Sequence, residues 1–385
     1  MNARLYFDWN ATAPLRPEAR AAVLSALDAV GNPSSVHAEG RAARWIIEEA
    51  RESVAALVGS EPRNVVFTSG GSEANMLALT PLPGSASAGS SLLVSAIEHP
   101  SVLAGGRFAA SNVERLAVTS RGEIDLAALA VRLEKASKDT LVSVMLANNE
   151  TGIVQPVSRV SALTHQAGGF LHVDAVQGPG RISCDIRELE ADLLTISGHK
   201  IGAPKGVGAL VRRDSAMPWP ASLVKGGGQE RGARAGTENV LGIAGFGAAA
   251  RTALEEGRAD RDLIALRERL EAGLKASSSE LVIFGAGVRR LPNTTLFALP
   301  GIKAETAVIA FDLDGVAVSS GAACSSGKVQ PSHVLAAMGI APELARAALR
   351  VSFGRSTTEL EVDLFINAWN KLSAALFKQK QVAAA

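Results

Sequence analysis

Short runs of apolar residues alternate with segments of helical periodicity between residues 40 and 255. Apolar side chains recur at helical spacing from Ala43 to Val58, and Gly59 follows where a left-handed glycine often ends a helix. Seven apolar runs are candidate strands, at residues 65–68, 92–96, 113–118, 141–147, 170–173, 193–196 and 207–211. Several are apolar at consecutive positions, as strands are when helices cover both faces of a sheet. The pattern predicts an α/β domain with a mostly parallel, seven-stranded sheet.

The pattern changes after residue 256. Leu263, Leu266, Leu270 and Leu274 form an apolar stripe among charged residues, which predicts a long connecting helix. Further candidate strands lie at 281–284, 294–299 and 316–320, with helices expected near 304–313 and from about 358. We therefore expect a large domain over residues 14–256 and a smaller α+β domain built from residues 1–13 and 257–385.

Composition narrows the class of protein. The chain has 385 residues, of which 47% are hydrophobic and 20% charged, and its formal net charge is +1. Such a balance gives no electrostatic reason to expect a nucleic acid or an anionic membrane as partner. No stretch approaches the apolar length of a membrane span, and the N-terminus lacks the apolar core of a signal peptide. With only two cysteines, the chain is expected to be a soluble, cytoplasmic protein.

Polar residues gather directly after the candidate strands, where open α/β sheets bind their ligands. After residues 65–68 come Gly70, Gly71 and Ser72. Glycines let the backbone approach a ligand, and free N–H groups at a helix start suit a phosphate. Glycine-rich turns are common, however, and this one lacks the Gly-Lys-Ser/Thr of a nucleotide-binding P-loop.

Three more strand ends carry titratable residues that are ambiguous when taken singly. Asp174 could hold a protonated ring nitrogen, but a lone Asp more often caps a helix. Lys200 directly follows an apolar strand, so its amine is expected to be desolvated, with a lowered pKa suited to a Schiff base. Taken alone, His99 is best explained as a histidine whose ring nitrogens find their hydrogen-bond partners within a turn. His172 and Asp174 lack partners at metal-ligand spacing, so no metal site is expected.

Cys324 lies in a stretch rich in serine and glycine, at residues 319–333. A cysteine in such a segment is unlike a core residue, and its thiol is expected to be accessible. The alternative interpretation is that Cys324 is exposed but has no function. This alternative is less favoured once the strand-end residues are considered together with Cys324.

Ten segments in this order resemble cysteine desulfurases of the NifS/IscS type, within the class V, fold-type I enzymes that depend on pyridoxal phosphate. The resemblance covers nearly the whole chain, at residues 6–14, 31–41, 67–75, 95–100, 147–156, 172–177, 197–210, 226–239, 320–335 and 350–355.

The resemblance implies a pyridoxal 5'-phosphate site. Lys200 would bind the cofactor covalently, Asp174 would pair with the ring nitrogen, and Gln177 would bond the ring hydroxyl oxygen. His99 would stack on the ring and assist proton transfer. The phosphate would be held by Gly71, Ser72, Ser197 and His199, with Thr237 reaching the phosphate of a neighbouring subunit, so a homodimer is expected.

The resemblance also implies the reaction. Arg350, assisted by Asn149, would bind the carboxylate of L-cysteine, a task that suits the planar fork of arginine. Cys324, as thiolate, would attack the substrate sulfur, leaving a persulfide and alanine. The sulfur would pass to an acceptor such as an iron–sulfur scaffold protein.

Some positions depart from the family pattern without removing a catalytic group. Trp9 stands where Asn is usual, Ser72 where Thr is usual, Gly202-Ala203 where Tyr-Gly is common, and Ala322 where Ser is common. We expect Trp9 and Gly202-Ala203 to alter pocket lining or loop packing.

Other functions of the same fold compete with this interpretation. An aminotransferase needs no mobile thiol, so Cys324 disfavours it, whereas a selenocysteine lyase is harder to exclude. A non-catalytic binding protein would be favoured by loss of Lys200, Asp174 or Arg350, and all three are present. A dinucleotide-dependent dehydrogenase is disfavoured because no G-x-G-x-x-G follows the first strand.

Overall fold

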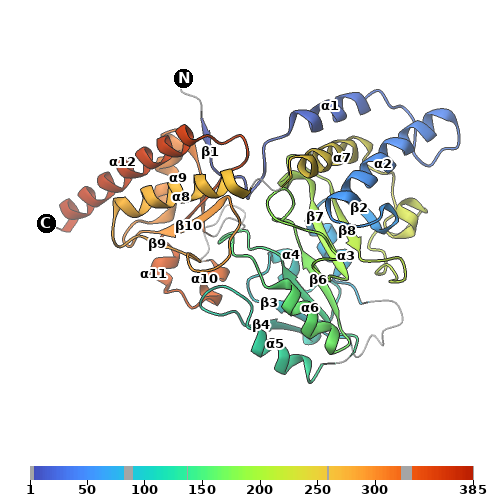
Figure 1. The fold of residues 1–385 in the computed structure, drawn as a ribbon, viewed down its shortest axis with the longest axis horizontal. Helices are drawn as coiled ribbons and strands as arrows, with labels where there is room; N and C mark the ends of the chain where they lie inside the picture. Colours follow the sequence, from blue (N-terminus) through green and yellow to red (C-terminus); the bar gives the residue numbers. More distant parts are fainter. Residues whose placement is uncertain (1–3, 82–89, 137, 258–259, 322–331, 385) are drawn as a thin grey trace.

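The computed structural model describes residues 4–81, 90–136, 138–257, 260–321 and 332–384. Two bodies lie side by side in Figure 1, a larger one around a central sheet and a smaller one that carries the C-terminal helix. Among these residues, no helix is both long enough and apolar enough to cross a bilayer.

The larger body is built on a seven-stranded sheet of order β2-β8-β7-β6-β5-β3-β4. Only β8 runs antiparallel to its neighbours, so the other six strands end at the same edge. The prediction of a mostly parallel, seven-stranded sheet is therefore confirmed. The strands are β2 Val65–Thr68, β3 Leu92–Ser95, β4 Val113–Leu116, β5 Leu141–Met145, β6 Phe170–Asp174, β7 Leu193–Ser197 and β8 Gly208–Arg212.

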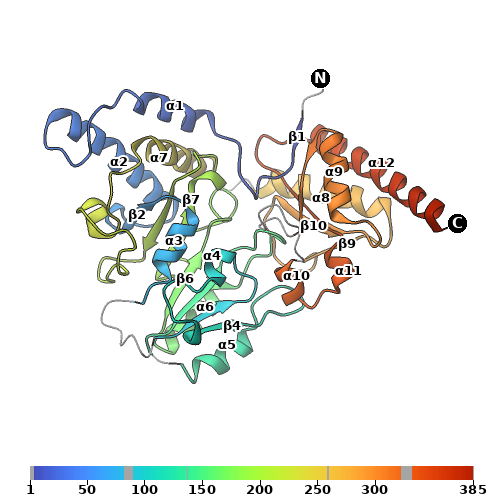
Figure 2. The ribbon, with the colours of Figure 1, turned by 180° about the vertical axis from the view of Figure 1, so that it is seen from behind.

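Helices cover both faces of this sheet because successive strand residues point to opposite sides and apolar residues occupy both sides of most strands. On β2, Val65 and Phe67 join the core beneath one helical layer, and Val66 joins the core beneath the other. The first layer consists of α1 Pro17–Ala26, α2 Ala38–Leu57, α5 Leu126–Leu133, α6 Val157–Gln166 and α7 Val240–Glu255. The second layer includes α3 Gly71–Ala78 and α4 Pro100–Leu103, which lie in front of the strands in Figure 2.

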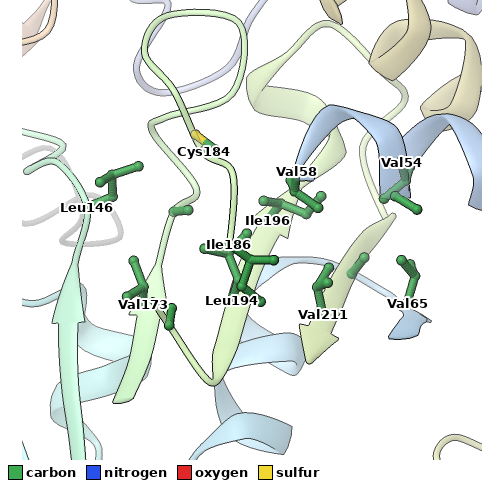
Figure 3. Close-up of a cluster of buried hydrophobic side chains, with 14 of the residues drawn as sticks. Val54, Val58, Val65, Leu146, Val173, Cys184, Ile186, Leu194, Ile196 and Val211 are labelled. Carbon is green, nitrogen blue, oxygen red and sulfur yellow. The ribbon is translucent and has the colours of Figure 1, made fainter. Parts of the chain in front are cut away.

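The first core is aliphatic and closely packed. Figure 3 shows its valine, leucine and isoleucine side chains between α2 and the strands, with Cys184 on a loop above them. The predicted helix is α2, and Gly59 follows its end at φ +66°, so that expectation is confirmed. Cys184 is buried, and its Sγ donates to the carbonyl oxygen of Ile182 at 3.4 Å.

The smaller body holds an antiparallel sheet of order β12-β13-β10-β9. Its strands are β9 Val282–Ile283, β10 Thr294–Ala298, β12 Ser319–Ser320 and β13 Ala348–Ser352. One face packs on α8 Asp260–Ser277, α9 Ala304–Leu313 and α12 Glu359–Ala384, and the other on α10 His333–Ala337 and α11 Pro342–Ala345. The leucine stripe of residues 263–274 is buried in the first of these interfaces, as its periodicity predicts.

Two details of the smaller body differ from the prediction. The single strand expected at 316–320 is two short strands: β11 Val316–Ala317 pairs with β1 Leu5–Tyr6, and β12 pairs with β13. The strand β13 lies between β10 and β12 but was not predicted, because Arg350 interrupts its apolar pattern. The side chain of Arg350 is nevertheless buried, and its guanidinium donates hydrogen bonds to Asp8 and Asn149.

Candidate active site

A cavity of about 260 Å³ opens where the strand ends of the sheet meet the smaller body and the N-terminal segment. It is lined by most residues that the sequence nominated: Gly71, Ser72, His99, Asn149, Asp174, Gln177, Ser197, His199, Lys200 and Arg350. Two nominated residues are not among them. Thr237 is exposed on the loop before α7, and Cys324 lies outside the described residues.

Lys200 ends the short 3-10 helix η3 Gly198–Lys200, directly after β7. Its Nζ donates to the carbonyl oxygens of Asn10 at 2.5 Å and Ala11 at 3.0 Å. The N-terminal segment therefore holds the amine at the cavity wall, where it can react with a carbonyl group.

Asp174 is the last residue of β6, and it is 5% exposed. Its Oδ2 accepts a hydrogen bond from Asn75 Nδ2 at 2.8 Å, and its Oδ1 accepts one from the backbone N–H of Val176 at 3.0 Å. Two donors on two oxygens are the pattern of an ionised carboxylate. The nearby Glu98 differs, because burial first and the charge of Asp174 second raise its pKa well above the usual range. Burial therefore favours the protonated form of Glu98, whereas two hydrogen-bond donors face the carboxylate of Asp174.

His99 caps the N-terminus of α4, and its Nδ1 accepts from the backbone N–H of Ser101 at 3.2 Å. Burial lowers the pKa of His99; Asp174 opposes that shift, and Lys200 and His333 add to it. The imidazole is therefore neutral near pH 7.

The N-terminus of α3 provides a place for an anion. Gly71 starts this helix, and a Cβ there would lie 3.0 Å from Cγ2 of Val176 and 3.3 Å from Cβ of Ser197. Only glycine lets these backbone and side-chain groups come together at the cavity. His199 completes this end: its Nδ1 lies 3.2 Å from Oγ1 of Thr12, and burial, helped by Lys200, lowers its pKa to about 4.

Arg350 reaches the cavity from the smaller body. Its Nη2 donates to Oδ1 of Asp8 at 2.7 Å, and its Nη1 donates to the carbonyl oxygen of Asn149 at 2.9 Å. The Nε atom is buried and has no hydrogen-bond partner among the residues that the structure describes. Because an unsatisfied charged donor is costly, this atom fits a site for a carboxylate ligand.

Sequence reasoning missed Arg181, which orients Gln177. The guanidinium of Arg181 donates to Gln177 Oε1, while Gln177 Nε2 donates to the carbonyl oxygen of Asn10 at 3.0 Å. Burial, with Arg350 as second cause, lowers the pKa of Arg181 to about 10, so it stays charged near pH 7. Since Arg181 faces Oε1 and Asn10 takes one Nε2 hydrogen, Gln177 keeps one amide N–H to offer to a ligand.

Other missed residues had weak signals in the sequence. Asn10 and Asn75 lie within the segments 6–14 and 67–75 that carry the resemblance, but neither had an assigned role. Ser101 follows the segment 95–100 by one position, so nothing in the pattern singled it out.

Two departures from the family pattern lie outside this cavity. Trp9 and Gly202 line a neighbouring cavity of about 250 Å³, which shares Lys200 with the first. A Cβ at Gly354 would lie 2.2 Å from the ring of Trp9, so the indole packs directly on that backbone. Trp9 and Gly202 therefore line the space next to Lys200 on the side away from the first cavity's other residues.

His172 uses both ring nitrogens within the sheet. Its Nδ1 lies 2.8 Å from Oγ of Ser143, and its Nε2 lies 3.0 Å from Oγ1 of Thr195. Burial lowers its pKa to about 4, so it is a neutral core histidine whose nitrogens are both occupied.

The groups in the cavity fit pyridoxal phosphate. A lysine amine can bind its aldehyde, a buried carboxylate can hold its ring nitrogen, and a helix N-terminus with two serines can hold its phosphate. Arg350, whose buried Nε has no partner in the part of the chain that the structure describes, remains for the carboxylate of an amino acid.

Comparison with known proteins gives a consistent result. Residues 5–365 match the family model "Aminotransferase class-V". A cysteine desulfurase of Gluconacetobacter diazotrophicus is 39% identical, and the alignment covers 98% of this chain and 94% of that protein. A NifS-like protein of Rickettsia africae superimposes with a TM-score of 0.88 at 36% identity, over 96% of this chain and 99% of its own. The structure of SspA in complex with cysteine superimposes with a TM-score of 0.77 at 30% identity, over 91% and 98% of the two chains.

Proposed function

The chain belongs to the class-V aminotransferase family and is a cysteine desulfurase, and we propose that it converts L-cysteine to alanine while Cys324 takes the sulfur as a persulfide. One observation carries the assignment of roles: Lys200, Asp174 and Arg350 face a single cavity from three separate segments of the chain. An amine, a carboxylate and a guanidinium are the groups that this chemistry needs for cofactor and substrate.

Pyridoxal phosphate, when bound, supplies an electron sink for negative charge at the substrate α-carbon. Lys200 would bind it and, once released, would be the amine that moves the α-proton. Asp174 would hold the proton of the ring nitrogen, and Gln177 would donate its remaining Nε2 hydrogen to the ring oxygen, since Arg181 faces its Oε1. The phosphate would be held by Gly71, Ser72, Ser197 and His199, which line the cavity.

Arg350 binds the carboxylate of L-cysteine. Its Nε is the open donor, and the side chain is oriented by Asp8 and by the carbonyl oxygen of Asn149. The complex of SspA with cysteine supports an amino-acid site in this fold. Asn149 lines the cavity beside Arg350 and is proposed to assist it.

The sulfur step uses Cys324 as a thiolate, which is the nucleophilic form of the thiol. A bond forms between Cys324 and the substrate sulfur as the bond from that sulfur to Cβ breaks. The electron pair stays on the carbon, which takes a proton and leaves as alanine, so the sulfur is oxidised and the carbon is reduced. Cysteine and the thiol thus give alanine and a persulfide without an outside oxidant.

The residues after Cys324 support its placement near the cavity. Ser332 Oγ donates to Glu150 Oε2, and Nε2 of His333 lies 2.9 Å from the carbonyl oxygen of Glu98. Glu98 and Glu150 directly adjoin His99 and Asn149, which line the cavity. One end of the segment that carries Cys324 is therefore fixed beside the proposed site.

We further propose a cytoplasmic homodimer that passes sulfur to an iron–sulfur scaffold or another acceptor protein, with no membrane or nucleic-acid partner. Thr237 is exposed, so its proposed phosphate contact would be made in a neighbouring subunit. Val36 and Trp45, which are 87% and 67% exposed, are apolar surface that a second subunit could cover.

The test is release of alanine and sulfide from L-cysteine, with pyridoxal phosphate and a reductant, by the wild-type protein and by Cys324→Ala. We expect both products from the wild type, and neither from the variant, while the cofactor absorbance is kept. Cys184→Ala is the matched control and should stay active. Normal turnover by Cys324→Ala would reject the persulfide route and favour a lyase or an aminotransferase.

A further inference from the structure

A chain of hydrogen bonds joins His99 to Asp174 through two residues without an assigned role. Nδ1 of His99 lies 2.7 Å from Oγ of Ser101, and Asn75 Nδ2 donates to the same Oγ at 3.0 Å. Asn75 Nδ2 also donates to Oδ2 of Asp174 at 2.8 Å. All four side chains line the proposed active-site cavity.

The backbone determines the direction of the bond at His99. The N–H of Ser101 points at Nδ1 of His99 at 3.2 Å, as part of the cap of α4. A backbone N–H can only donate, so Nδ1 must be the nitrogen that carries a lone pair. A proton on Nδ1 would face this N–H directly.

Asp174 determines the direction of the other bonds. Were the Asn75 amide reversed, its oxygen would face the ionised carboxylate of Asp174, with acceptor against acceptor. The Nδ2 atom therefore faces Asp174 and gives its second hydrogen to Ser101 Oγ, consistent with Asn75 Oδ1 having no partner among the described residues. Because Ser101 Oγ accepts from Asn75, its own hydrogen is available for Nδ1 of His99.

We infer that Ser101 and Asn75 are positioning residues that hold the proton of neutral His99 on Nε2. This inference rests on the proposed function only for its consequence in the reaction. In the hydrogen bonds of the described residues, His99 uses Nδ1 alone, which leaves Nε2 as the ring nitrogen for a ligand in the cavity. His99 then begins the cycle as a hydrogen-bond donor to the ligand, because its lone-pair nitrogen Nδ1 is already occupied.

Titratable groups from three other segments face the same imidazole. Asp174 at the end of β6 favours its protonation, whereas Lys200 of η3 and His333 of α10 oppose it. These groups affect whether the ring is protonated. The contacts at Nδ1 determine which of the two ring nitrogens carries the proton of the neutral ring.

The test is ¹⁵N NMR of the holoenzyme labelled at its histidine nitrogens, with His99→Gln used to assign the signals. In the wild type we expect Nε2 of His99 to be protonated and Nδ1 to show the shift of a hydrogen-bonded acceptor. Ser101→Ala removes a donor to the neutral ring, so the pKa of His99 should rise by about half a unit to one unit. Ser101→Thr keeps the hydroxyl and should restore the wild-type value.

A second serine–histidine pair provides the matched control. Ser161 Oγ lies 3.2 Å from Nδ1 of His165 on α6, away from the cavity, so Ser161→Ala should shift the signals of His165 and leave those of His99 unchanged. The inference is overturned if wild-type His99 carries its proton on Nδ1, or if Ser101→Ala leaves its pKa and proton position unchanged. A holoenzyme without desulfurase activity but with an Nε2 proton would reject the proposed function and keep this inference.

Discussion

At the scale of single residues, the cavity combines groups of fixed charge with groups that burial keeps neutral. Arg350 and Arg181 are buried cations, and Asp174 has the hydrogen bonds of a carboxylate. Burial raises the pKa of Glu98 and lowers that of His99, so it favours the neutral form of both side chains. Because the cavity contains few charged side chains, each charged group of a ligand can pair with one side chain of opposite charge.

Arg350→Lys tests the carboxylate site. A lysine keeps the charge but loses the planar fork, and a hydrogen bond to a charged group is worth about 1.5–3 kcal/mol. We expect kcat/KM for L-cysteine to fall by about 10- to 100-fold, mainly through KM. Arg269→Lys, at an exposed ion pair with Asp363, is the control and should change nothing. An unchanged KM in Arg350→Lys would remove Arg350 from the substrate site.

Glu150 gives a prediction about pH. Burial, opposed by the hydrogen bond from Ser332 and the charge of Arg350, raises its pKa from 4.5 to about 7. The folded state therefore holds a proton that the unfolded state has released, and this residue makes stability fall as pH rises from about 4.5 to about 7. Glu150→Gln cannot titrate, so it should gain up to about 3 kcal/mol relative to wild type at pH 8 and little at pH 4.5. Urea unfolding across this range is the measurement, and parallel curves for the two proteins would contradict the assignment.

The sequence predicted the site residues that act through their position at strand ends. Lys200 and Asp174 follow apolar runs directly, so a parallel sheet brings them to one edge. Arg181 and Ser101 escaped because their importance comes from contacts with other side chains, Gln177 and His99. Hydrophobic pattern and spacing carry no information about such contacts.

At the scale of elements, the strands and the turns after them set the shape of the cavity. Most strands of the large sheet were predictable because they are short, mainly apolar runs. The strand β13 was not, since it places the charged Arg350 in its centre and is covered on both sides by neighbouring strands. Burial of a charge for function overrides the local pattern that prediction relies on.

Gly208→Ala tests the close approach of β8 to the turn before α3. A Cβ at Gly208 would lie 2.6 Å from the carbonyl carbon of Gly70 and 2.9 Å from the carbonyl oxygen of Ile196. The turn must then move, and overpacking of this kind costs about 1–3 kcal/mol. We expect pyridoxal phosphate to bind the apoenzyme about 10- to 100-fold more weakly, as measured by absorbance titration. Gly287→Ala, where a Cβ meets nothing within 4 Å, is the control, and equal affinities would contradict the prediction.

Glu230 anchors the 3-10 helix η4 Gln229–Gly232, in which it adopts a left-handed φ of 48°. Its carboxylate accepts from both Nη atoms of Arg51, at 2.7 and 2.9 Å, and from the backbone N–H of Phe67 at 3.0 Å. Glu230→Ala leaves Arg51 buried without this partner, and breaking a buried pair costs about 3–5 kcal/mol. We expect that loss in urea unfolding, against less than about 1 kcal/mol for Asp363→Ala at the exposed pair with Arg269. A small loss in Glu230→Ala would mean that the anchor is dispensable.

At the scale of the whole molecule, the site exists only where separate parts of the chain meet. Asn10 comes from the N-terminal segment, Lys200 from the large sheet and Arg350 from the smaller body. Arg350 bonds both Asp8 and the backbone of Asn149, so it joins these parts as well as lining the cavity. Local sequence patterns predicted the strand end that carries Lys200 but not the strand that carries Arg350, whereas the order of ten segments along the whole chain indicated how the parts work together.

The central claim is that sulfur leaves L-cysteine as a persulfide on Cys324. The holoenzyme is mixed with one equivalent of L-cysteine without reductant, digested, and analysed by peptide mass spectrometry alongside alanine release. We predict one added sulfur atom on the peptide that contains Cys324, in proportion to the alanine formed, and none on the peptide of the buried Cys184. Alanine release without added sulfur on Cys324, or with the sulfur on Cys184, would contradict the account.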